Sequence, residues 1–279
     1  MAIFKYLPRE RGLRVLTECE LMVTPPKWLN DPFECSPVIK CKDPEAYASR
    51  RIDEIMGSPE FFETHRTQFP DLTFEDFQRG LHENRSQLLE RLVAGTSGVD
   101  SHIQDLAQEI VSKNFGVICF AADGLHQTMW AHYASSHEGL VIEFRSSHQL
   151  FSGPSFFEME YSDEPAVFDP SNRAERDEAR RFLIRKGLRW SSERESRLLV
   201  ELSKATIRNV PEGDRYFIPI EPEIIISVTL GLRATNETQD ALIELLHAPH
   251  FENVGLFKIT KNTEAGTFER ERLRALRNS

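Results

Sequence analysis

The sequence predicts a mixed α+β fold in which a β-rich core is interrupted by a helical insertion. Short apolar segments outnumber those that a doubly wound α/β fold needs, and helical segments do not alternate with them in a regular order. From about Asp43 to Asn114 the chain is polar, has helical periodicity and shows almost no strand signal. We therefore expect a single α+β domain over residues 1–279, with residues 43–114 as a helical insertion within it.

The composition is that of a globular protein, and the length allows one large domain or a core domain with a sizeable insertion. The chain has 279 residues, of which 40% are hydrophobic and 28% are charged. No window approaches the roughly 18 uncharged apolar residues of a membrane span, and the N-terminus lacks the long apolar segment of a secretory signal. The four cysteines have neither CxxC nor paired metal-ligand spacing. We expect reduced thiols, a cytoplasmic location and no membrane partner.

The net charge of −10 opposes broad, sequence-independent binding to nucleic acid, because such binding requires many Lys and Arg side chains to neutralise phosphates. A local basic groove remains compatible with this charge. The clearest basic tracts are Arg173 to Arg189 and Arg270 to Arg277, and both also carry carboxylates. We predict a solvated helix face for each tract.

The N-terminal part predicts two strands and a helix before the insertion. The expected elements are a strand over Phe4 to Leu7, a helix over Gly12 to Glu18, and a strand over Leu21 to Thr24 that ends at Pro25-Pro26. Within the insertion, one amphipathic helix is predicted to begin near Thr73, with Asp76 placed for a capping box. A second is predicted after an Asp100 cap.

After the insertion, apolar segments predict that the β-rich core resumes. The expected strands are Gly116 to Phe120, Leu140 to Phe144, Phe156 to Tyr161, Ser196 to Leu202, Tyr216 to Ile220, Ile224 to Leu230 and Gly255 to Thr260. Two helices are predicted in this part, a charged one over Glu175 to Arg189 and one near Asp240 to His247. The basic C-terminal end is expected to be frayed.

One segment concentrates aromatic side chains with polar tips. Trp130, His132 and Tyr133 are followed closely by His137. Such rings suit a wall that stacks on a planar ligand and donates hydrogen bonds to it, but they also fit a helix that simply buries its Trp and Tyr. The two histidines lie five apart beside Glu138 and lack a third ligand or HExxH spacing, so we expect no metal site.

A second candidate is the Asn-Asp-Pro-Phe-Glu sequence at residues 30–34. Asn and Asp next to Pro favour a turn, because their side chains bond to the local backbone and Pro restricts φ. One interpretation is a turn in which Phe33 is a buried anchor. The other is a rigid loop that presents Asn30, Asp31 and Glu34 to a polar ligand.

The third candidate runs from Trp190 to Arg197, where a charged segment passes into an apolar strand. Residues two apart on a strand share a face, so Glu193, Glu195 and Arg197 are expected to project together. These charges fit a solvated edge. They also fit a carboxylate that Arg197 keeps ionised and that stabilises positive charge developing on a sugar ring.

In their order along the chain, these segments resemble the prokaryotic family called domain of unknown function 2971. The matching positions are Lys5-Tyr6, Asn30 to Glu34, Met129 to Tyr133, His137 to Gly139, Tyr161, Lys186, Trp190, and the Glu-x-Glu-x-Arg motif at Glu193 to Arg197. The resemblance covers nearly the whole chain except the insertion from about residue 43 to residue 114.

More distantly, the layout resembles the ADP-ribosyltransferase fold, especially DarT-type nucleic-acid-modifying toxins. This resemblance implies a mostly antiparallel β core, NAD as the substrate cofactor, and Glu195 as the catalytic acid, with Glu193 as a second acid whose role can be exchanged with it. The cofactor-binding residues that it implies are Lys5, Tyr6, Asn30, Asp31, Glu34, Trp130, His132, Tyr133 and Arg197. The chain departs from the usual first motif, because Lys5-Tyr6 stands where that fold has His or Arg.

The resemblance implies an NAD-dependent ADP-ribosyltransferase-like protein of a toxin–antitoxin or phage-defence system. Its acceptor would be a nucleic acid or a protein, and an antitoxin would be its regulatory partner. The alternative is a non-catalytic module that binds a nucleotide or a protein in the same aromatic pocket. A nuclease is less well supported, because no group of acids has metal-ligand spacing.

Overall fold

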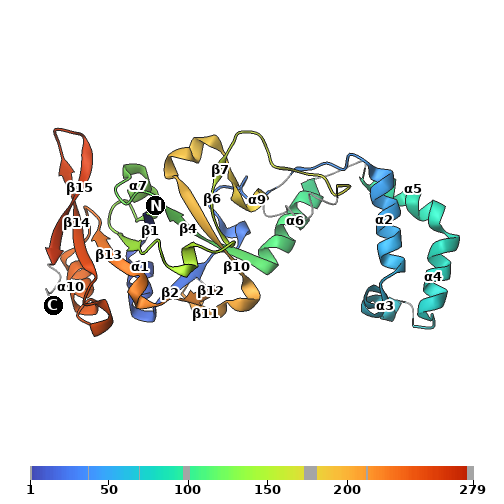
Figure 1. Ribbon diagram of the computed structural model, residues 1–279, viewed down its shortest axis with the longest axis horizontal. Helices are drawn as coiled ribbons and strands as arrows, with labels where there is room; N and C mark the ends of the chain where they lie inside the picture. The colour runs from blue at the N-terminus through green and yellow to red at the C-terminus, as the bar shows by residue number, and fades with distance from the viewer. Residues whose placement is uncertain are drawn as a thin grey trace. The chain divides into compact units, whose positions relative to one another are not determined.

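The computed structural model describes residues 2–36, 38–68, 70–96, 101–172, 181–211 and 213–274 (Figure 1). It confirms a mixed α+β fold with a large, mostly antiparallel sheet. The chain divides into two compact units. The core unit comprises Met1–Glu34, Ile110–Glu164 and Ile184–Ser279, and the helical unit comprises Cys35–Glu109 and Pro165–Leu183. None of the described helices has the length and apolar content of a membrane span.

Helices fill the segment for which the sequence predicts an insertion. They are α2 (Pro44–Met56), α3 (Pro59–His65), α4 (Phe74–Glu83), α5 (Arg85–Thr96) and α6 (Ser101–Asn114). The capping box at α4 is confirmed, since Thr73 Oγ1 accepts from the Asp76 N–H at 3.1 Å and Asp76 Oδ2 accepts from the Thr73 N–H at 3.3 Å. The predicted Asp100 cap lies outside the described residues. The helical unit also contains the short parallel pair β3 (Val38–Ile39) and β8 (Val167–Phe168).

The core unit is built on a sheet of eight strands in the order β15-β14-β13-β5-β1-β4-β10-β6. The strands are β1 (Ile3–Leu7), β4 (Phe115–Ala121), β5 (Leu140–Phe144), β6 (Phe156–Glu158), β10 (Glu195–Glu201), β13 (Ile225–Leu230), β14 (Gly255–Asn262) and β15 (Thr267–Arg274). Neighbouring strands are antiparallel except β13 and β14, which are parallel.

A smaller sheet adjoins the larger one where β1 and β4 separate. It consists of β11 (Thr206–Val210), β12 (Gly213–Pro219) and β2 (Glu20–Val23). The register of β1 with β4 has the single pair Phe4–Ala121, whereas β1 pairs with β5 over its full length. Nearer the start of β4, Val117 forms a bridge with Thr24, which follows β2. The large sheet is therefore open between β1 and β4, and this opening is where the candidate site lies.

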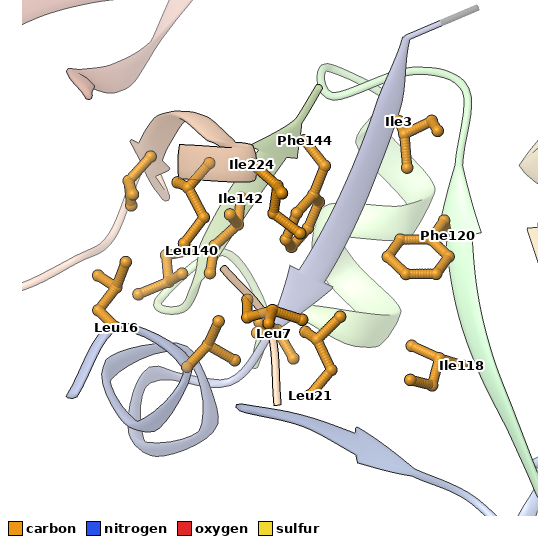
Figure 2. Close-up of a cluster of buried hydrophobic side chains, with 14 of the residues drawn as sticks. Ile3, Leu7, Leu16, Leu21, Ile118, Phe120, Leu140, Ile142, Phe144 and Ile224 are labelled. Atoms are coloured by element: carbon orange, nitrogen blue, oxygen red, sulfur yellow. The ribbon is translucent and has the colours of Figure 1, made fainter. Parts of the chain in front are cut away.

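Alternation along the strands assigns side chains to the two faces of the large sheet. The larger apolar cluster gathers alternate residues of β1, β4 and β5 together with α1 (Arg9–Glu18) and α10 (Asn236–Leu245). Figure 2 shows Leu7 of β1 near Leu140 and Ile142 of β5, with Leu16 of α1 beside them. The intervening residues Tyr6 and Val141 belong to a second cluster with α7 (Gln127–Tyr133).

Two predictions about charged segments are wrong. Within the segment predicted as a helix over Glu175 to Arg189, only α9 (Arg181–Ile184) is α-helical among the described residues, and residues 175–180 lie outside them. It is followed by β9 (Arg185–Lys186) and the 3-10 helix η4 (Leu188–Glu193). β9 pairs with β7 (Glu160–Tyr161), so strand pairing overrides local helix propensity.

The C-terminal end is a strand as far as Arg274, where a frayed end and a helix face were predicted. Antiparallel pairing with β14 stabilises β15, and that partner cannot be recognised from the composition of the tail. Residues 275–277 of the basic tract lie outside the described residues. The predicted strand over Phe156 to Tyr161 is divided into β6 and β7 at Met159, whose N–H donates to the Glu195 carbonyl at 3.0 Å. Strand β11 was not predicted.

Candidate functional site

The core unit contains a pocket of about 680 Å³ at the opening between β1 and β4. Its walls come from β1, α1, β2, β4, α7, β10 and β12, so segments distant in the sequence meet there. On β2, the alternate residues Glu20 and Met22 face the pocket, whereas Leu21 and Val23 face the apolar core. A pocket of this size accommodates an organic ligand of several hundred daltons.

Five buried charged side chains form what we call the glutamate cluster: Glu34, Glu193, Glu195, Lys186 and Arg197. Lys186 Nζ lies 2.7 Å from Glu193 Oε2, 2.8 Å from Glu195 Oε2 and 3.1 Å from Glu34 Oε1. Arg197 Nε lies 2.5 Å from Glu195 Oε1, and its Nη2 pairs with Glu34 Oε2. None of the five side chains is more than 8% exposed. Three carboxylates and two cations leave the cluster one formal negative charge.

Local backbone structure positions the acids of the cluster. Glu195 and Arg197 are two apart at the start of β10 and both face the pocket. Glu193 ends η4, and Arg194 then takes a left-handed conformation with φ 44°, so the Glu193 side chain joins the same wall. The Tyr161 hydroxyl accepts a hydrogen bond from the Glu195 N–H at 2.7 Å. The predicted projection of Glu193, Glu195 and Arg197 to one side is therefore observed.

The ion pairs keep both Glu195 and Lys186 charged. Burial by itself would raise the pKa of Glu195, but Arg197 and Lys186 outweigh burial and lower it to about 2. Burial would lower the pKa of Lys186, but Glu195, Glu34 and Glu193 outweigh burial and raise it. Glu195 is therefore a carboxylate at neutral pH and has no proton to donate.

Lys5 extends this wall from β1. Its ammonium donates to the Cys119 carbonyl at 2.9 Å and lies 5.4 Å from the centroid of the Phe120 ring. Burial lowers the pKa of Lys5, while Cys119 and Glu195 partly oppose that shift. Burial raises the pKa of the Cys119 thiol to about 12, so the thiol is neutral.

Hydrogen bonds join the three segments that the sequence singled out. The Tyr133 hydroxyl donates to Glu193 Oε1 at 2.7 Å and accepts from Asn30 Nδ2 at 3.1 Å. Trp190 Nε1 donates to Asp31 Oδ2 at 2.7 Å, and Lys186 Nζ lies 5.0 Å from the centroid of the Trp190 ring. The aromatic helix, the Asn-Asp-Pro-Phe-Glu turn and the Glu-x-Glu-x-Arg strand therefore meet at one site.

Most of the predicted site residues line the pocket. These are Lys5, Tyr6, Asn30, His132, Tyr133, Glu193, Glu195 and Arg197. The Tyr6 hydroxyl donates to the Asp123 carbonyl at 2.8 Å and accepts from the His126 N–H at 3.1 Å.

The other three predicted residues, Asp31, Glu34 and Trp130, lie behind the pocket wall. Trp130 is fully buried, donates from Nε1 to the Gly124 carbonyl at 3.0 Å and packs edge-on against Tyr6. It packs in the core, as in the interpretation that the helix simply buries its Trp. Asp31 accepts a hydrogen bond from Trp190, and Glu34 belongs to the glutamate cluster. The interpretation of Phe33 as a buried anchor is wrong, because Phe33 is 76% exposed.

The sequence did not identify several pocket residues. Lys186 belongs to the motifs of the resemblance but received no role, because nothing local shows that a lysine in a charged segment will be buried. Tyr161, whose hydroxyl accepts from the Glu195 N–H, also belongs to these motifs and received no role. Arg11 and Arg14 lie on α1, and Arg215 lies on β12. The predicted helix over Gly12 to Glu18 contains Arg14 but not Arg11, so only the observed α1, which begins at Arg9, places both arginines three apart on one helix.

A lysine occupies the centre of the acidic group. Among the described residues, no group of three or more His, Cys, Asp and Glu side chains is arranged to hold a metal ion. The Lys186 ammonium instead lies within 3.1 Å of three carboxylates. Comparison of the chain with protein-family models, curated protein sequences and solved structures gave no match.

Proposed function

We propose that this protein binds an NAD-type dinucleotide in the pocket and cleaves its N-glycosidic bond, as the ADP-ribosyltransferases that its motifs resemble do. The proposal depends on one observation, that Glu193 and Glu195 reach the pocket side by side with Tyr133 and Lys5. The resemblance adds a nucleic-acid or protein acceptor and a toxin or defence role to this proposal.

In the proposed reaction, the bond between C1 of the ribose and the nicotinamide nitrogen breaks, and its electron pair leaves with the nicotinamide. A lone pair of the acceptor, or of water when no acceptor is present, forms the new bond to C1, and the proton of that nucleophile passes to solvent. Positive charge develops on the ribose in an oxocarbenium-like transition state. A fixed carboxylate stabilises that charge without having to reorganise. Each carboxylate oxygen can accept two hydrogen bonds, so Glu195 retains acceptor capacity beyond its bonds to Arg197 and Lys186. Its role is therefore electrostatic and hydrogen-bonding.

The test is nicotinamide release from NAD by the wild type and by Glu193→Gln and Glu195→Gln. Each variant is expected to lose on the order of a hundredfold in rate. Glu201→Gln is the matched control, because Glu201 lies on the same strand, is exposed, and pairs with Lys204 at 2.9 Å. Thermal unfolding of each variant separates loss of chemistry from loss of fold. Equal release by the wild type and both cluster variants would contradict the proposal.

A second candidate function is a non-catalytic nucleotide- or protein-binding module. The observation that favours it is that Arg197 and Lys186 already bind both oxygens of Glu195. For such a module, calorimetry should show NAD binding without nicotinamide release, and Glu195→Gln should change only the affinity.

A further inference from the structure

We propose that the pocket wall formed by α1 and β12 is a phosphate-binding subsite, in which Arg11, Arg14 and Arg215 bind the diphosphate of a nucleotide. The identity of the complete ligand rests on the proposed function above. The recognition of phosphate does not, because it requires no bond cleavage.

The first observation is the charge of the pocket. Six Lys and Arg side chains and four Glu side chains line it, which gives a formal charge of +2. The whole chain has a net charge of −10. A concave site of opposite sign to the rest of the protein attracts anions by focusing the local field.

The second observation is that the carboxylates of the lining are already paired. Arg208 binds Glu20 through two hydrogen bonds of 2.6 and 2.5 Å, and Lys186 and Arg197 form ion pairs with the acids of the glutamate cluster. No ion pair within the described part of the chain involves Arg11, Arg14 or Arg215, and Arg215 donates from Nη1 to the Asp214 carbonyl at 2.9 Å. Guanidinium groups with unfilled donors in a pocket are suited to phosphate, whose oxygens match their geometry.

The third observation is that aromatic rings hold two of these arginines. Arg14 lies 5.9 Å from the centroid of the Phe217 ring, and Arg215 lies 4.7 Å from the centroid of the Trp28 ring. Stacking occupies the flat face of a guanidinium and leaves the N–H groups at its edge available to a ligand. Because Arg215 and Phe217 share a face of β12, the contact between Arg14 and Phe217 brings α1 and β12 together at this wall.

Lys5 connects the arginines to the glutamate cluster. Lys5 lines the same pocket as Arg11 and Glu195, and these two charges shift the pKa of Lys5 in opposite directions. A ligand that contacts both walls therefore needs anionic groups near the arginines and a group with hydroxyls or positive charge near Glu195. A nucleoside diphosphate joined to a sugar has this arrangement.

The test is calorimetric titration of the full chain with ADP, inorganic pyrophosphate and adenosine. Arg14→Gln and Arg215→Gln are each expected to weaken binding of ADP and of pyrophosphate by about tenfold or more, and to leave adenosine binding unchanged. Arg14→Lys keeps the charge but not the paired N–H geometry, so it should recover only part of the affinity. Arg66→Gln is the matched control, because Arg66 is exposed in the helical unit and pairs with Glu63.

The two proposals can fail separately. Unchanged affinity of both Arg14→Gln and Arg215→Gln for ADP and pyrophosphate would overturn the subsite, even if the wild type released nicotinamide. Arginine-dependent binding of ADP, together with no nicotinamide release from NAD, would leave the subsite standing and refute the proposed reaction, because binding of ADP requires no bond cleavage.

Discussion

Lys186 is the residue on which the glutamate cluster depends. Three buried carboxylates without a cation would repel one another and lose their hydration, which costs several kcal/mol per ion. The Lys186 ammonium contacts all three, and Arg197 contacts two of them. These pairs keep Glu195 ionised in an interior position. The ionised state of Glu195 is therefore set by two basic residues.

At the residue scale, the stability of the protein is expected to depend on pH through Glu195. Its pKa is about 2 in the folded protein against an ordinary value of 4.5. Since the folded pKa is the lower one, the contribution is fully present above the ordinary value and is lost as the pH falls from about 5 toward 2. The shift corresponds to about 3 kcal/mol. Urea unfolding of the wild type and of Glu195→Gln over this pH range measures it.

The difference in unfolding free energy between the wild type and Glu195→Gln isolates the contribution of Glu195 from those of the other carboxylates. The free energy of unfolding should fall more steeply with decreasing pH in the wild type than in Glu195→Gln. Glu201→Gln, which changes an exposed acid of the same strand, should keep the wild-type slope. Identical slopes for the wild type and Glu195→Gln would show that Glu195 is not held ionised by the cluster.

At the scale of elements, an unusual turn fixes the helix that carries Tyr133. After α7, the backbone of Ser135, Ser136 and His137 has φ values of 47°, 52° and 75°. These values lie in the left-handed region, which residues other than glycine rarely adopt. The loop at Gly231 binds this turn, since the Gly231 N–H donates to the Gly139 carbonyl at 2.9 Å. A Cβ added at Gly231 would lie 2.1 Å from the His137 carbonyl oxygen. The close approach therefore requires glycine.

Gly231→Ala is expected to destabilise the protein by about 2 kcal/mol or more, because the methyl group collides with backbone rather than with a movable side chain. Gly80→Ala is the matched control. Gly80 lies within α4, and a Cβ there would meet nothing within 4 Å. This change should stabilise its helix by up to about 1 kcal/mol. Thermal unfolding of the Gly231→Ala and Gly80→Ala variants measures both effects. A Gly231→Ala protein as stable as the wild type would refute the close-packing argument.

At the scale of the whole molecule, each of the two compact units has features of its own. Every residue that lines the pocket belongs to the core unit. The helical unit has an aromatic core of its own, in which Phe62 is 2% exposed and contacts Phe74 and Phe77 at ring-centroid distances of 5.7 and 5.3 Å. Each unit therefore has its own source of apolar stabilisation.

Phe62→Ala is expected to destabilise the helical unit by about 3–5 kcal/mol, the usual cost of truncating a buried Phe. Amide hydrogen exchange should show lost protection in α2 to α5 and unchanged protection in β4 and β10. Phe144→Ala, at a fully buried position of β5, is the converse variant. It should lower the protection of amides in the core unit and leave the protection of α2 to α5 unchanged. Equal loss of protection in both units from Phe62→Ala would contradict separate stabilisation.

Local patterns determined most of the elements. Apolar runs predicted β1, β4, β5, β10, β13 and β14, and a Thr-x-x-Asp sequence predicted the capping box of α4. These signals are local, because strand alternation and helix caps depend on residues only a few positions apart. Unusual composition singled out the segments that carry Tyr133, Glu193, Glu195 and Arg197, and the resemblance placed these residues in one candidate site.

Only the tertiary structure decided which of these side chains reach a ligand and what charge they carry. It placed Tyr133 at the pocket and the neighbouring Trp130 in the core, brought Lys186 between three acids, and assembled arginines from α1 and β12 around one cavity. Burial of a charge is stable only beside partners that come from distant parts of the chain. No local pattern records those partners, so the sequence determined the candidate residues and the fold determined their chemistry.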